Sequence, residues 1–131
     1  MIKARIAKEA IVRVNNRTGA LAQVTKSLAD KGLNIEAVIA TVEGTEAVIR
    51  VVTGDHQRTL DSLRDQRLEV QEARVVVADV EHRPGLLREI TEKLARQHID
   101  LSYLYATATG DRCLVIFSST NNDWAVKVLN E

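Results

Sequence analysis

An internal repeat with an offset of 66 residues, the spacing between Gly19 and Gly85, constrains this chain more than any other feature of its sequence. Sliding the sequence by that offset pairs residues 12–53 with residues 78–119 without a gap. Ten of these pairs are identical: Val14/Val80, Arg17/Arg83, Gly19/Gly85, Leu21/Leu87, Thr25/Thr91, Leu28/Leu94, Ala29/Ala95, Ala40/Ala106, Thr41/Thr107 and Gly44/Gly110. Such self-similarity indicates repeated structural units. Since two units of 66 residues would fill the 131 positions, we expect two copies of one small module and no separate catalytic domain.

The periodicity of each repeat predicts the order strand, helix, strand, strand, helix. The predicted elements are strands at 10–15 and 75–80, helices that begin after Gly19 and Gly85, hairpins that turn at Gly44 and Gly110, and second helices at about 55–66 and 122–130. Apolar residues at helical spacing predict one buried stripe on the first helix of each repeat, formed by Leu21, Val24 and Leu28 and by Leu87, Ile90 and Leu94.

The first helix of each repeat is expected to end in a left-handed residue. Gly32 follows the first of these helices, and glycine is the residue that most often adopts this conformation at a helix end. At the offset position the second helix is followed by His98, which tolerates the conformation less well. The two repeats therefore differ in a position that matters for stability.

The pattern of each repeat is one strand short of the ferredoxin-like βαββαβ fold. Residues 67–73 can supply the fourth strand of the first unit, and residues 1–7 lie at the same offset from them. We therefore expect a first unit at 8–73, and a second unit at 74–131 that takes residues 1–7 as its fourth strand. No Gly, Pro or Asn interrupts residues 2–14 or 68–80, so each is expected to be one long strand shared between the units. These strands would run antiparallel about a pseudo-twofold axis.

Charge and cysteine content exclude several classes of protein. The 18 basic and 18 acidic residues cancel, so the chain lacks the net positive charge typical of proteins that bind nucleic acid or anionic membranes. The single cysteine, Cys113, cannot form an internal disulfide, and its place in the apolar run CLVIF predicts a small buried thiol.

No apolar stretch approaches the ~20 residues of a membrane span, and the N-terminus lacks the hydrophobic centre of a signal peptide. We expect a cytoplasmic protein that binds neither nucleic acid nor membrane.

Each repeat resembles an ACT domain, the small ligand-binding module of amino-acid metabolism. HRPGLL at residues 82–87 is close to the usual loop of that family, and NNRTGAL at residues 15–21 is a looser version with Thr18 where proline is common. The resemblance covers nearly the whole chain and implies an α+β fold of two ferredoxin-like units in tandem, with antiparallel sheets and helices on one face. It also implies a regulatory protein that senses an amino acid or a similar small metabolite, regulates an enzyme of amino-acid metabolism, and needs no cofactor.

The resemblance further implies that a ligand lies between the loop of one module and the start of the second strand of a neighbouring module. Carried over by position, the loop residues are Asn15, Asn16, Gly19, Ala20 and Leu21 in the first repeat and His82, Arg83, Pro84, Gly85 and Leu86 in the second. The facing residues would be Asn34, Ile35, Asp100 and Leu101.

The loop residues have chemistry that suits an amino acid. A glycine at the junction lets a ligand approach the backbone, and the first-turn amides of a helix are anion donors. Asn15 and Asn16 carry donors and acceptors, and Arg17 or Arg83 can add a charge-assisted bond to a carboxylate. In the alternative interpretation, Asn16 or Thr18 caps the helix and no ligand binds.

The apolar strand CLVIF predicts a homodimer. Its side chains alternate between two faces, with Cys113, Val115 and Phe117 on one and Leu114 and Ile116 on the other. Burial on both faces is therefore expected, although helices cover only one of them. A second subunit would cover the other face or pair with a free edge of the second strand. Tyr103 and Tyr105 alternate onto one face of that strand, where packing or interface roles are the more common.

Other functions fit the sequence less well or stay open. The loop G-x-V-Q-G-V-x-F-R of acylphosphatases, which share this fold, is absent. The three histidines stand beside no nucleophile and show no metal-ligand spacing, so we expect neither an enzyme nor a metal site. RNA binding on such a sheet requires stacking aromatics, and the two strands in question contribute only Phe117. A ligand-free scaffolding module remains an open alternative.

Overall fold

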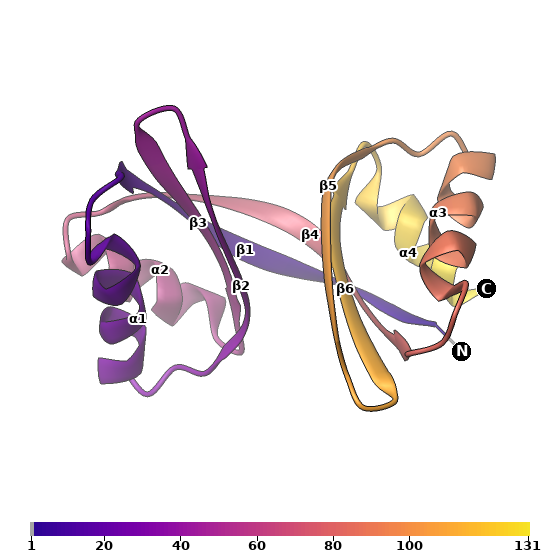
Figure 1. Ribbon diagram of the computed structural model, residues 1–131, viewed down its shortest axis with the longest axis horizontal. Helices are drawn as coiled ribbons and strands as arrows, with labels where there is room; N and C mark the ends of the chain where they lie inside the picture. Colours follow the sequence, from indigo (N-terminus) through magenta and orange to yellow (C-terminus); the bar gives the residue numbers. More distant parts are fainter. Residues whose placement is uncertain (1) are drawn as a thin grey trace. The chain divides into compact units, whose positions relative to one another are not determined.

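The computed structural model describes residues 2–131, so Met1 of the predicted N-terminal strand lies outside the described residues. The chain forms two compact units (Figure 1). The first unit consists of Lys8–Ala73, and the second consists of Arg74–Glu131 together with the N-terminal residues up to Ala7. The α+β fold predicted from the sequence, with two βαββαβ units in tandem, is confirmed.

Ten elements follow one another in the order predicted by the repeat. They are β1 (Lys3–Asn15), α1 (Ala20–Asp30), β2 (Ile35–Glu43), β3 (Glu46–Thr53), α2 (His56–Asp65), β4 (Glu69–Glu81), α3 (Leu86–Arg96), β5 (Leu101–Thr109), β6 (Arg112–Ser119) and α4 (Asn122–Asn130). Strands β1 and β4 are each 13 residues long and uninterrupted, as the absence of turn residues predicted. Each contributes to both units.

In the first unit the strand order is β2-β3-β1, with β4 beside β1. Both β1 and β2 pair antiparallel with β3, and Val12 lies opposite Ile49 in the register of β1 and β3. Helices α1 and α2 cover one face of this sheet (Figure 1). The core between them contains Ala10, Val12, Val24, Leu28, Leu33, Ile49, Val51, Leu60 and Leu63. Ser27 and Ser62 join the two helices, because each hydroxyl donates to the backbone carbonyl of the other residue, at 3.2 and 3.0 Å.

In the second unit the order is β5-β6-β4, with β1 beside β4. Helices α3 and α4 cover one face of the sheet and enclose a core of Val76, Ala78, Val80, Leu86, Ile90, Leu94, Ile99, Val115, Phe117, Ala125, Val128 and Leu129. Ile2 and Ala4 belong to the same core and are 8% exposed. The side-chain amide of Asn130 accepts from the Ala4 amide at 2.8 Å and donates to the Ala4 carbonyl at 2.9 Å. The N-terminal strand is therefore part of the second unit.

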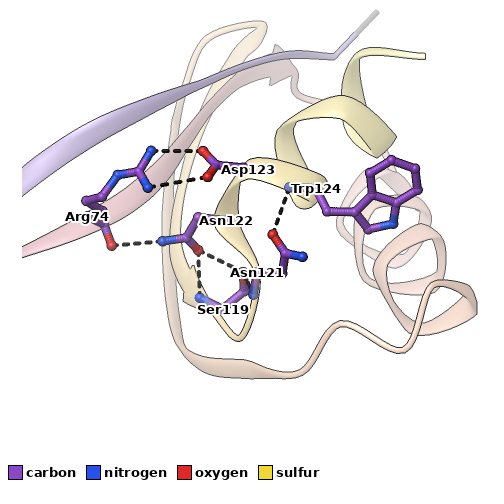
Figure 2. A network of polar contacts seen from close by, with 6 residues as sticks. All are labelled: Arg74, Ser119, Asn121, Asn122, Asp123 and Trp124. Carbon is purple, nitrogen blue, oxygen red and sulfur yellow. Dashed lines mark hydrogen bonds and ion pairs between the residues drawn. The ribbon is translucent and has the colours of Figure 1, made fainter.

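A polar network holds the start of α4 against the sheet of the second unit (Figure 2). The Arg74 guanidinium contacts the Asp123 carboxylate at 2.8 Å, and this pair lowers the pKa of the Asp123 carboxyl group. The Asn122 side chain donates to the Arg74 carbonyl at 3.0 Å and accepts from Ser119. The Asn121 side chain accepts from the Trp124 amide at 3.1 Å and caps the helix. These contacts cap α4 or join it to β4 and β6 of the same unit, so the network has a structural role.

The helix ends agree with the sequence analysis, but the buried stripe does not. Gly32 and His98 both adopt the left-handed conformation, with φ of 70° and 55°. The prediction that Leu21 and Leu87 belong to the buried stripes is wrong, because they are 42% and 45% exposed. In the first turn of each helix the buried position is one residue earlier, at Ala20 in α1 and at Leu86 in α3.

The strand CLVIF is buried on both faces at its centre, as predicted: Val115 and Ile116 are 1% and 2% exposed. Ile116 reaches this burial in a single chain, so a second subunit is not required to cover it. The prediction of a buried thiol at Cys113 is wrong, because Cys113 is only half-buried near the hairpin end of β6. Tyr103 and Tyr105 share one face of β5, and their rings stack with centroids 6.5 Å apart.

Candidate ligand-binding site

The loop before each first helix is organised by a glycine in the left-handed conformation. Gly19 and Gly85 have φ of 89° and 83° and stand immediately before α1 and α3. Neither helix has a side-chain cap, so the interpretation in which Asn16 or Thr18 caps α1 is wrong. The physical reason is that the glycine itself occupies the capping position. A Cβ at either glycine would meet nothing within 4 Å, so the backbone conformation, and no neighbouring atom, requires glycine there.

The first turn of each helix presents amide groups to the loop. The Ala20 amide donates to the Arg17 carbonyl at 3.2 Å, and the Gln23 amide donates to the Gly19 carbonyl at 2.9 Å. Within residues 2–131, the amides of Leu21 and Ala22 have no protein acceptor. The second unit repeats the arrangement at Leu86–Glu89. These amides lie at the positive end of the helix dipole, which favours a negatively charged group.

Beside each loop lies a hollow bounded by the hairpin of the same unit. The first hollow, of about 300 Å³, is lined by Asn16, Arg17, Gly19, Ala20, Leu21, Ala22, Ala40, Thr41, Val42, Ala47 and Ile49. The second hollow, of about 380 Å³, is lined by Val80, Glu81, His82, Arg83, Gly85, Leu86, Leu87, Arg88, Ala106, Thr107, Ala108, Cys113 and Val115. Both volumes are at the low end of the ~300–1,000 Å³ of small-molecule sites.

The two hollows are the same site in two copies. Eleven lining positions of the first hollow recur, at the offset of 66, in the lining of the second. Five of these eleven pairs are identical, namely Arg17/Arg83, Gly19/Gly85, Leu21/Leu87, Ala40/Ala106 and Thr41/Thr107. The other 31 of the 42 aligned positions also contain only five identical pairs, so identity is more frequent in the lining. The repeats have thus stayed more alike around the hollows than elsewhere. Leu21 and Leu87 are large apolar residues that are not part of the core, since each is nearly half exposed.

The loop arginines are held by side chains of the following helix. Arg17 donates to the side-chain carbonyl of Gln23, and Arg83 donates to the Glu89 carboxylate at 2.7 Å. The second contact lowers the pKa of the Glu89 carboxyl group, chiefly through the hydrogen bond from Arg83. The predicted charge-assisted bond to a ligand carboxylate would therefore compete with Glu89 in the second unit and with a neutral amide in the first.

The structure brings together most of the loop residues predicted from the sequence. Asn16, Gly19, Ala20 and Leu21 line the first hollow, and His82, Arg83, Gly85 and Leu86 line the second. Asn15 and Pro84 are exposed and do not line either hollow.

The predicted facing residues lie at the opposite end of the second strand within each unit. Asn34 and Ile35 stand at the start of β2. Asp100 and Leu101 line a separate hollow of about 400 Å³ with Thr91, Leu94, Ala95, His98 and Ile99. Their approach to the loop of a neighbouring unit stays a prediction.

The sequence analysis missed the hairpin side of both hollows. In the first hollow it is formed by residues 40–42, and in the second by residues 106–108 with Cys113. The signal was present, because the identical pairs Ala40/Ala106 and Thr41/Thr107 have no obvious core function. Residues 40–42 are exposed in β2, and such identity without burial points to a surface with a function.

Fold and site together define a tandem of ferredoxin-like domains, each with a hollow between a glycine-started helix and a hairpin. The chain belongs to the ACT domain pair family, whose model matches residues 6–131. No curated protein matches the chain. No helix among residues 2–131 is both long and apolar enough to cross a membrane.

Solved structures with the same fold include proteins from three bacteria. A protein of Bacteroides thetaiotaomicron superposes with a TM-score of 0.91 at 24% identity, covering 98% of this chain and 89% of that one. The regulatory subunit of aspartate kinase from Thermus thermophilus, in its ligand-free form, gives a TM-score of 0.72 at 13% identity, covering 98% and 94%. Aspartokinase III of E. coli, in complex with aspartate and ADP, gives 0.64 at 14%, covering 98% of this chain and 31% of the enzyme.

Proposed function

We propose that this chain is a regulatory protein that binds an amino acid at its loop hollows and thereby regulates an enzyme of amino-acid metabolism. The observation that carries the proposal is the retention of five identical lining pairs in two otherwise divergent repeats. Packing does not account for this retention, because Leu21, Leu87 and Ala40 are exposed. The resemblance to the regulatory subunit of aspartate kinase supports the same class of function.

The proposed ligand contacts follow from the chemistry of the lining. The first-turn amides of α1 and α3 would bind the carboxylate, since they are unpaired donors at a helix N-terminus. The loop side chains Asn16 and His82 carry acceptors for the ammonium group. Asn34, Ile35, Asp100 and Leu101 would approach the ligand from a neighbouring unit, and Asn15 and Pro84 would shape the loop.

A thermal-shift screen of the purified chain against the twenty amino acids tests the proposal. A ligand that binds only the folded state stabilises it by RT ln(1 + [L]/Kd), or about 2.7 kcal/mol at a concentration of 100 Kd. We expect at least one amino acid to raise the melting temperature at millimolar concentration. A flat response to all twenty would contradict the proposal and favour ligand-free scaffolding.

Truncation of the exposed leucines identifies the hollows as the site. Leu21→Ala and Leu87→Ala remove lining atoms at positions that are 42% and 45% exposed, so each variant is expected to fold normally and to bind less tightly. Trp124→Leu is the matched control, because Trp124 is an apolar residue that is 40% exposed and lines neither hollow. Equal loss of binding in all three variants would place the ligand elsewhere.

We also propose a homodimer. Strands β2 and β5 are the last strands of their sheets, and each leaves one edge without a neighbouring strand among the described residues. Val38 and Val42 make the edge of β2 apolar and are 43% and 59% exposed. Pairing of such an edge with a second copy would satisfy its backbone groups.

A further inference from the structure

The second hollow has an apolar surface where a ligand side chain would lie. Its floor is formed by Leu86 and Val115, which are 6% and 1% exposed. The half-buried Cys113 and the exposed Ala106, Thr107 and Ala108 complete the hairpin side. Thr107 carries the single hydrogen-bonding group among these side chains and none of them carries a charge, so a charged ligand side chain would lose its hydration here without gaining an opposite charge.

The two hollows also differ in charge. In the second hollow, Arg83 contacts the carboxylates of Glu89 at 2.7 Å and of the lining residue Glu81 at 4.0 Å, and Arg88 contacts Glu92 at 2.8 Å. In the first hollow Arg17 bonds to the neutral Gln23, and no carboxylate among residues 2–131 is paired with it. The second hollow therefore has no excess positive charge to attract an acidic side chain.

We infer that the second hollow selects an amino acid with an uncharged, apolar side chain of about the size of leucine or methionine. The inference rests on the proposed function and specifies the ligand of one of its two sites. Each CH₂ group buried on the floor is worth about a fourfold change in affinity. Leucine is therefore expected to bind at least tenfold more tightly than alanine. Aspartate and lysine, whose charges would meet an apolar surface, are expected to bind more weakly than leucine by a similar factor.

Titration of the ¹⁵N-labelled full-length chain, followed by amide NMR spectra, tests the inference. Leucine, methionine and alanine are the apolar probes, and aspartate and lysine are the charged probes. Leucine is expected to shift the amide signals of residues 82–88 and 106–108 with an affinity above that of the other classes. Stronger shifts at residues 16–22 and 40–42, or equal affinity for aspartate or lysine in the second hollow, would overturn the inference while leaving the proposed function in place.

Filling the hollow provides a second test. Ala106→Leu adds a side chain to the hairpin side of the second hollow at an exposed position, so folding is expected to persist and leucine affinity to fall at least tenfold. Thr109→Leu adds the same side chain to an exposed position of β5 outside the hollow and is expected to bind leucine normally. Ala40→Leu fills the equivalent place in the first hollow. Loss of leucine binding in Ala40→Leu but not in Ala106→Leu would assign leucine to the first hollow and refute the inference. A flat thermal-shift response to all twenty amino acids would instead refute the proposed function itself.

Discussion

Deletion of residues 2–7 is expected to unfold the second unit and to spare the first. Ile2 and Ala4 are 8% exposed within the second core, and burial of an isoleucine is worth about 1.5–3 kcal/mol and of a methyl group about 0.8 kcal/mol. The two hydrogen bonds between Ala4 and Asn130 add about 1 kcal/mol each. The total loss of about 4–6 kcal/mol is comparable to the ~5–15 kcal/mol that stabilises a whole domain.

Hydrogen exchange measures this loss separately in each unit. A loss of about 4 kcal/mol corresponds to roughly a thousandfold faster exchange. We expect that change for the amides of Val76–Val80 in β4, because that part of β4 loses its neighbouring strand. The amides of Val48–Val51 in β3 serve as the internal control and should keep their protection. Unchanged exchange in β4 would show that the N-terminal strand is dispensable.

Substitution of Asn130 tests the same contact without shortening the chain. Asn130→Ala removes both hydrogen bonds to the Ala4 backbone and is expected to destabilise the second unit by about 1–3 kcal/mol. Asn130→Asp keeps an acceptor for the Ala4 amide, and its neutral carboxyl group at low pH can also donate to the Ala4 carbonyl, whereas the ionised group has no donor. Its destabilisation should therefore increase as the pH rises and the carboxyl group ionises. An alanine variant as stable as the wild type would contradict the proposed role of the contact.

Three further predictions concern a helix end, the charge in the second hollow and the assembly. His98→Gly is expected to raise stability by about 0.5–1 kcal/mol in thermal unfolding, and Gly32→His to lower it, because both positions have positive φ. Glu89→Gln should raise the affinity for a carboxylate ligand severalfold at low salt by releasing Arg83, and an unchanged affinity would exclude Arg83 from the contact. Because Arg83 lowers the folded-state pKa of Glu89, its stabilisation is present above the unfolded carboxyl pKa of about 4.3 and is lost as the pH falls through the lower folded value. The difference in melting temperature between wild type and Glu89→Gln should therefore shrink as the pH falls below about 4.3. Sedimentation at micromolar concentration is expected to show a dimer, and a monomer would refute the edge pairing.

The elements of this fold follow from local sequence signals. Helix α4 occupies Asn122–Asn130, the range that its apolar spacing predicts, and the hairpins turn at Gly44 and Gly110, which both have positive φ. The 66-residue offset also predicted one long-range pairing. It placed the N-terminal residues in the second unit at the position that residues 67–73 have in the first unit. A strand far from its unit in sequence was therefore predictable.

The candidate site was predictable on the loop side only. The helical spacing of apolar residues does not decide whether the buried stripe begins at Ala20 or at Leu21, because the two residues are neighbours in the first turn and both are apolar. The hairpin residues that line the hollows depend on how far β2 and β5 extend beyond their helices. That distance is set by the packing of the whole unit and not by local sequence. The fully buried Glu9, which accepts a hydrogen bond from Arg50 at 3.2 Å, was likewise not predictable, because its partner is 41 residues away and is set by packing around the paired strands.

The contact between Ala4 and Asn130 spans 126 residues and so determines the order in which the molecule can mature during translation. The residues of the first unit leave the ribosome before those of the second, whereas the second unit must wait for the last turn of α4 although its N-terminal strand was synthesised first. Until then, residues 2–7 are an unprotected strand on a growing chain. A segment fused ahead of them would therefore adjoin the strand that can pair only after the rest of its unit has been synthesised.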